Sequence, residues 1–232
     1  KPGRLPRLEG YWLMLRREAA AFNGTAGRER RYTFGARLAG TAGGARAEYD
    51  FEAAYQWGSL GAGTISAAMS GGELAYPVAQ VPGRPRFHAG LDYASGDGSA
   101  GGNVGTFNQL FPLGHAFLGY IDVVGRQNVV ALNAGVGIKP VESLQADVTA
   151  HHFRRASTND GLYNAGGGVE RASGVTRAAT VGTELDVTLT WRLGPHVAGL
   201  VGYSRFAPGP FIEQTGASEN LRFVYGSLQL TY

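Results

Sequence analysis

The sequence contains no cysteine among its 232 residues. This absence excludes a disulfide framework and any metal site built from thiolates. Lysine is almost missing too, so arginine carries nearly all of the formal net charge of +3. A basic excess this small and dispersed fits an anionic small ligand better than a nucleic acid. No zinc-finger, helix-turn-helix or RNA-binding signature accompanies it, and no nucleic-acid partner is expected.

Long apolar runs are absent as well. No stretch of about eighteen apolar residues occurs, which excludes a transmembrane helix. Residues 1–7 lack the apolar segment and the small-residue cleavage site of a signal peptide. Two interpretations of this beginning stay open: the chain is a mature protein, or it is the later part of a longer one.

Residues 46–57 show the pattern that indicates the fold class. Polar side chains alternate with small and aromatic ones, and a period of two is that of a β-strand. About twelve residues is long for a soluble strand but suits a tilted strand that crosses a bilayer. A wall with lipid on one side and water on the other satisfies both faces. The alternative is a solvent-facing strand of a soluble sandwich.

The rest of the chain repeats this pattern. We predict further strands at residues 8–17, 31–40, within 64–81, 86–94, 128–138, 143–155, 181–193, 196–206 and 221–232. We count these strands in chain order, with residues 46–57 in the third. The links after the second, fourth, sixth and eighth strands are short, and most links after the odd-numbered strands are long, as in outer-membrane barrels. The sequence therefore predicts an all-β fold. It is an antiparallel transmembrane β-barrel of about ten strands, with short periplasmic turns and long extracellular loops, in one domain spanning residues 1–232.

Several segments then resemble the alginate export family of outer-membrane porins. They are YASGD at 93–97, FNQLFPLGHAFLGYIDVVGRQN at 107–128, EAAYQ at 52–56, DGLY at 160–163, GTELD at 182–186 and GYSRFAPG at 202–209. The resemblance implies an eighteen-stranded barrel in the bacterial outer membrane that exports an anionic polysaccharide such as alginate. Because only about ten strands can be drawn, we expect the C-terminal part of such a barrel, or a shortened member.

The polar positions of the predicted strands supply candidates for lining a pore. Rings of arginine in a narrow, water-filled passage favour anions. The alternative is that carboxylates on the same face neutralise each arginine. The candidates are Arg31, Arg37, Arg46, Glu48, Asp50, Glu52, Arg86, Asp92, Asp147, Glu184, Asp186 and Arg192.

The loop at residues 107–127 is too apolar to extend freely into water. Apolar residues recur at helical spacing within 114–124 and predict a short helical turn there. We expect the loop to fold over or into the extracellular mouth as a constriction; packing on the barrel rim without effect on passage is the alternative. The constriction candidates are Asp122, Arg126, Gln127 and Arg205.

Catalytic and metal chemistry finds little support in the sequence. His151 and His152 are neighbours on a strand and so point to opposite faces, which disfavours a shared metal ion. Asp50 and Glu52 have the spacing of a glycosidase pair, but a ladder of salt bridges explains them better. We expect no metal, no cofactor and no enzyme. The expected partners are an anionic polysaccharide, outer-membrane lipid and the barrel assembly machinery. A structural or surface-binding barrel without an open pore, or a barrel hydrolase, remains the alternative.

Overall fold

The computed structural model describes residues 6–42, 47–111, 115 and 117–231. Ten strands form one antiparallel sheet, each strand pairing with its neighbour in the sheet, so the prediction of about ten antiparallel strands is confirmed. Their bounds are β1 (Arg7–Phe22), β2 (Thr25–Ala42), β3 (Ala47–Leu60), β4 (Gly63–Pro77), β5 (Arg86–Ala94), β6 (Val129–Val141), β7 (Leu144–Arg154), β10 (Thr180–Arg192), β11 (Val197–Pro208) and β12 (Leu221–Leu230).

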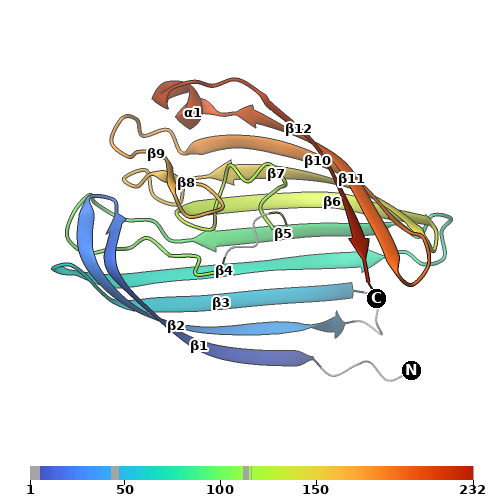
Figure 1. The fold of residues 1–232 in the computed structure, drawn as a ribbon, viewed down its shortest axis with the longest axis horizontal. Coiled ribbons are helices and arrows are strands. Elements are labelled where there is room, and N and C mark those ends of the chain that lie inside the picture. The colour runs from blue at the N-terminus through green and yellow to red at the C-terminus, as the bar shows by residue number, and fades with distance from the viewer. Residues whose placement is uncertain (1–5, 43–46, 112–114, 116, 232) are drawn as a thin grey trace.

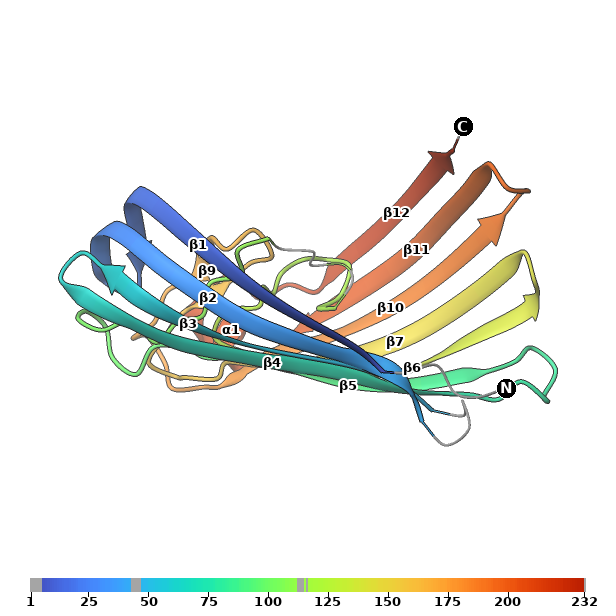
Figure 2. The ribbon, with the colours of Figure 1, turned by 90° about the horizontal axis from the view of Figure 1, so that it is seen from below.

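The sheet is bent into a trough (Figures 1 and 2). Strands β1 and β12 lie at its two margins (Figure 2). Within the described residues these two strands are not paired with each other, so the sheet has two free edges and the predicted closed barrel is not formed. No helix in this part of the chain is long and apolar enough to cross a membrane.

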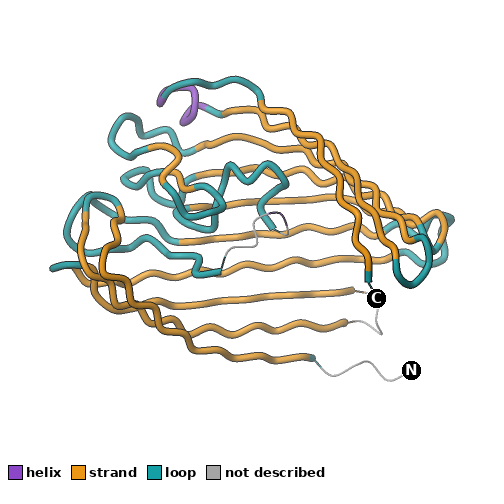
Figure 3. Tube along the Cα trace, viewed as in Figure 1, coloured by secondary structure: helices purple, strands orange, loops and turns teal. Residues whose placement is uncertain are grey.

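The connections divide the sheet into two ends. The segments at residues 95–128, 155–179 and 209–220 all leave one end, which we call the loop end (Figure 3). Residues 78–85, 142–143 and 193–196 connect strands at the opposite end, the turn end. The loop end also carries two tight hairpins, at residues 23–24 and 61–62, so its connections are not uniformly long.

The first of these hairpins corrects a prediction. The sequence predicts a long loop after the first strand, whereas β1 and β2 continue until Phe22 pairs with Thr25. Asn23 and Gly24 both have positive φ, 40° and 85°, as a tight type I′ hairpin turn requires. The composition of this segment suggested a loop, but cross-strand pairing extends both strands through it.

The two faces of the sheet differ in polarity. Loop residues in the trough hydrogen-bond to Gln56 and Glu184, so these side chains belong to the concave face. The opposite, convex face exposes large apolar side chains on most strands; among them are Trp12, Phe34, Phe51, Tyr55, Leu91, Leu132, Val187 and Tyr203. The predicted alternation therefore holds along the wall. Pairing with β2 also shows which residues of β1 are on each face. Tyr11 pairs with Gly35 on the concave face, and Trp12 pairs with Phe34 on the convex face.

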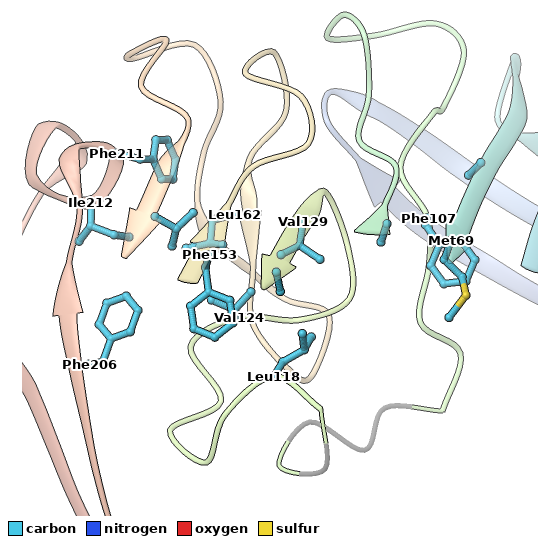
Figure 4. Packing of buried hydrophobic residues seen from close by; sticks show 14 of the residues in the cluster. Met69, Phe107, Leu118, Val124, Val129, Phe153, Leu162, Phe206, Phe211 and Ile212 are labelled. Carbon is cyan, nitrogen blue, oxygen red and sulfur yellow. The ribbon is translucent and has the colours of Figure 1, made fainter. Parts of the chain in front are cut away.

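The hydrophobic core lies between the wall and the loops that fill the trough. Phe153 and Val181 from the wall pack in one buried cluster with Leu118, Val124 and Leu162 from the loops (Figure 4). Helix α1 (Pro210–Thr215) contributes Phe211 and Ile212 to it. The short hairpin of β8 (Leu162–Tyr163) and β9 (Val169–Arg171) was not expected from the sequence.

Two local predictions need correction. Within the segment predicted as a helical turn, residues 117–124 form turns and irregular backbone, residue 115 is in 3₁₀ conformation, and residues 114 and 116 fall outside the described part of the chain. Gly119 and Asp122 have φ of 85° and 61° there, and such left-handed residues interrupt a helix. Gly71 and Gly72 do not interrupt β4, which runs through them. A Cβ at Gly71 would meet Asp92 Oδ1 at 2.4 Å, so glycine leaves room for that carboxylate.

Candidate functional site: a polar cleft in the trough

A cleft of about 470 Å³ lies on the concave face, between the wall and the tip of the 95–128 loop. Strands β2 to β7, β10 and β11 contribute residues to it, and the loop contributes His115, Phe117, Tyr120 and Arg126. Eight of the candidates named from the sequence line this cleft. They are Arg37, Asp50, Glu52, Arg86, Asp92, Arg126, Asp147 and Asp186.

Arginines of the cleft wall are paired with carboxylates on the next strand or the one beyond it. Arg37 Nε donates to Asp50 Oδ1 at 2.7 Å. Arg86 Nε donates to Glu48 at 2.8 Å, and its Nη2 donates to Glu73 at 2.8 Å. These side chains are partly exposed, so water screens their attraction. The predicted ladder of salt bridges is therefore present. It includes Asp50 of the carboxylate pair that could have suggested a glycosidase, whereas Glu52 accepts a hydrogen bond from the Tyr11 hydroxyl.

Two histidines lie beside carboxylates of the concave face, on β7 and β10. His88 Nε2 lies 3.5 Å from Asp147 Oδ2, and Thr149 donates to the other oxygen of Asp147 at 2.7 Å. His151 Nε2 lies 3.2 Å from Asp186 Oδ2. His152, by contrast, pairs with Leu132 on the convex face. The two neighbouring histidines thus point to opposite faces, as predicted.

Arg126 joins the loop to the wall. Its Nη2 lies 2.6 Å from Asp92 Oδ1, and its guanidinium lies 4.6 Å from the centre of the Phe117 ring. Asp92 is buried and Arg126 is mostly buried. The pair joins the loop tip to β5, and loss of either partner would leave the other charge buried without compensation.

Several candidates lie outside the cleft. Arg31 is fully buried under the loop, where it donates to Glu29 at 2.7 Å and to Gln56 at 2.6 Å, so it does not line a passage. Glu184 is also buried and accepts the Ile121 N–H at 2.9 Å. The alternation gave both residues the correct face, but the loop covers them.

The remaining candidates differ in place. Gln127 is buried within the loop, and Asp122 lies 3.0 Å from His115 at the loop tip. Arg192 is exposed at the turn end of β10, outside the cleft. Arg205 lies in β11 opposite Leu185, so it is on the convex face and is not part of a constriction. Arg46 falls outside the described residues.

A buried hydrogen-bond network holds the loops against the wall. Asp160 Oδ2 accepts the Asp97 N–H at 2.8 Å and the Thr106 hydroxyl at 2.6 Å. Asn128 Nδ2 donates to Gly161 O at 2.8 Å. Gln56 on β3 accepts the Asn108 N–H at 2.9 Å. These bonds join four of the segments singled out in the sequence, so much of that pattern specifies how the loops dock.

Two loop carboxylates have raised pKa values. Burial raises the pKa of Asp97, although the Gly105 N–H and Asn23 act in the opposite direction. Burial also raises the pKa of Asp122, and the nearby His115 opposes the shift. Desolvation disfavours the charged form in both cases. Both carboxyl groups therefore keep their protons up to a higher pH than they would in water.

The cleft as a whole does not present an unopposed positive ring. Arg37, Arg86 and Arg126 face six carboxylates, those of Asp50, Glu52, Glu73, Asp92, Asp147 and Asp186. Glu73 was missed in the sequence because the glycine pair before it obscured the alternation. Tyr11, whose hydroxyl donates to Glu52, was missed because β1 is apolar on both faces. Among the described residues, no group of three or more His, Asp or Glu side chains is arranged to hold a metal ion.

Comparison with protein families supports the resemblance found in the sequence. The model of a family described as alginate export matches residues 1–225 of the chain. The chain belongs to the alginate export family. This is a transport family and not an enzyme family, and it is associated with export across the outer membrane. Membership supports a role in alginate export or transport. A search of curated proteins found no significant match.

Proposed function

We propose that this alginate export family member forms part or all of the wall of an outer-membrane channel through which an anionic polysaccharide such as alginate crosses passively. The observation that carries the proposal is the contrast between the two faces of one sheet. The convex face exposes large apolar side chains, whereas the concave face lines a cleft with charged side chains. Lipid on one side and water on the other suit these faces.

Membrane insertion requires the edges of the sheet to be paired. A free edge in hydrocarbon leaves N–H and C=O groups without partners, at a cost of several kcal/mol for each group. We therefore propose a closed barrel in which the edges of β1 and β12 are completed, with each other or with further strands. Residues 1–232 act as one barrel domain in this proposal, with outer-membrane lipid and the barrel assembly machinery as partners.

The paired charges suit a polymer that carries both carboxylates and hydroxyl groups. A uronate carboxylate can replace Asp50 as the partner of Arg37. Sugar hydroxyls can then donate hydrogen bonds to the protein carboxylates that have lost their arginine partner. Charge-assisted hydrogen bonds of this kind are stronger than neutral ones. Weak, exchangeable sites in series favour entry without trapping the chain. Selection then rests on exchange of ion pairs and does not need a net positive lumen.

The experiment is single-channel recording in planar bilayers with alginate oligosaccharides and uncharged oligosaccharides of equal length. We expect open channels that the acidic sugars block preferentially. Arg37→Gln should weaken that block by about tenfold, as expected for the loss of one charged hydrogen bond. Arg192→Gln, exposed outside the cleft, is the matched control and should leave block unchanged. Equal block by both sugars would contradict selection by the cleft.

A surface barrel without an open passage is the second candidate. The observation in its favour is the buried contact of Leu118 and Val124 with the wall, which packs the 95–128 loop into the trough. Absence of conductance from folded protein, even after the loop is released, would favour this candidate over the channel.

A further inference from the structure

The convex face carries two pairs of arginines that face each other across strands at the loop end. Arg16 on β1 is the direct partner of Arg30 on β2. Arg205 on β11 is the direct partner of Arg222 on β12. All four side chains are exposed. The same arrangement therefore occurs twice, near each of the two margins of the sheet.

Like charges placed directly opposite each other destabilise a sheet, because their Cβ atoms are only about 5 Å apart. No ion pair among the described residues involves any of these four arginines. The arginines of the cleft, in contrast, each have a carboxylate partner. An anion from outside the chain would relieve the repulsion on the convex face.

An aromatic residue lies beside each pair, one step toward the middle of the sheet. Tyr32 follows Arg30 on the same face and stacks between Trp12 and Trp57, with ring centres 6.0 Å and 5.7 Å away. Tyr203 holds the corresponding place beside Arg205. Tyrosine and tryptophan mark the boundary between hydrocarbon and headgroups. The arginine pairs therefore lie just beyond that boundary, at the depth of the headgroups.

We propose that each arginine pair binds the phosphate of an anionic lipid headgroup in the leaflet at the loop end. The inference rests on the proposed membrane barrel, which places this face in lipid. Guanidinium groups contact phosphate oxygens through two parallel N–H bonds, so two facing arginines can hold one phosphate between them. Their stems lie along the apolar face while the charged ends reach the headgroups.

The tryptophans provide the test. The chain has three. Trp12 and Trp57 stack on Tyr32, the next residue after Arg30 on the same face of β2, whereas Trp191 is on this face near the turn end of β10. The Trp191→Phe variant, reconstituted in phosphatidylcholine vesicles, reports on the Arg16–Arg30 pair alone. Trace tail-brominated phosphatidic acid is compared with tail-brominated phosphatidylcholine as a fluorescence quencher. We expect stronger quenching by the anionic lipid, and a preference about five-fold weaker for each arginine removed, as in Arg16→Gln/Arg30→Gln.

Two controls make the result specific. Arg177→Gln/Arg192→Gln removes the same charge from exposed residues away from the arginine pairs, and should keep the preference. The Trp12→Phe/Trp57→Phe variant reports from Trp191, and should show no preference for the anionic lipid.

The outcomes separate this inference from the proposed channel. Quenching by phosphatidylcholine without any anionic preference would overturn the lipid site and leave the membrane barrel standing. No quenching by either lipid would overturn both. A preference that inorganic phosphate in the buffer abolishes would mean that the pairs bind free phosphate, which would also overturn the lipid site.

Discussion

At the scale of single residues, two arginines on the same face of one strand have different roles. Arg31 and Arg37 are both on the concave face of β2. Arg37 lines the cleft and pairs with Asp50 in contact with solvent. Arg31 is sealed under the loop and holds Glu29 and Gln56. Loop coverage, which alternation does not report, decides between a residue that can bind a solute and one that stabilises the fold.

This difference predicts the effect of removing each charge. Arg31→Met leaves the buried Glu29 with only Arg17 as a charged partner and should lower the free energy of unfolding by about 3 kcal/mol, as expected when one member of a buried ion pair is lost. Arg192→Met, exposed at the turn end, should change it by less than about 0.5 kcal/mol. Urea titration in detergent micelles, followed by tryptophan emission, measures both. Equal effects would contradict a buried structural role for Arg31.

At the scale of elements, the 95–128 loop lies along the cleft and contacts the wall at several points. Leu118 and Val124 anchor it in the core cluster, and Arg126 ties its tip to Asp92 on β5. His115, Phe117 and Tyr120 then face the cleft. The described part of the loop thus packs against the wall through its own apolar side chains.

Release of this loop should open the passage. Leu118→Asp places a charge in the core cluster, where an unpaired charge is costly, so the loop should detach. We expect trypsin to cut at Arg126 and the single-channel conductance to rise. Phe111→Asp changes a residue that is 82% exposed and serves as the control. Cleavage without any change in conductance would show that the loop packs on the wall without restricting passage.

At the scale of the whole molecule, the trough separates an apolar exterior from a charged interior. If the convex face lies in lipid, a charge placed on it must lower the free energy of unfolding by an amount that depends on its depth in the bilayer. Val187→Arg, in the middle of β10, should cost about 2–4 kcal/mol, whereas Leu8→Arg, near the turn end of β1, should cost about 0–1 kcal/mol. Unfolding in phosphatidylcholine vesicles measures the difference. Equal and small costs would mean that water, and not lipid, covers this face.

The sequence by itself determined the class of fold and the facing of most strands. Residues 86–94 were predicted as a strand with its observed bounds, because a two-residue period records which face meets water. The predicted strand ends were wrong where backbone conformation outweighed composition, as at the hairpin of Asn23 and Gly24. The cleft-lining residues on β2, β3, β5 and β7 follow from the same alternation.

Only the tertiary structure decided which concave residues stay accessible. Whether Arg31 or Arg37 meets solvent depends on where the 95–128 loop docks, and that docking uses Asp97, Asp160 and Asn128, which are far apart along the chain. The facing arginines of the convex side likewise depend on the register between strands. Local periodicity is a property of neighbours in sequence. Coverage and register arise from contacts between distant segments, which the periodicity of one strand does not contain.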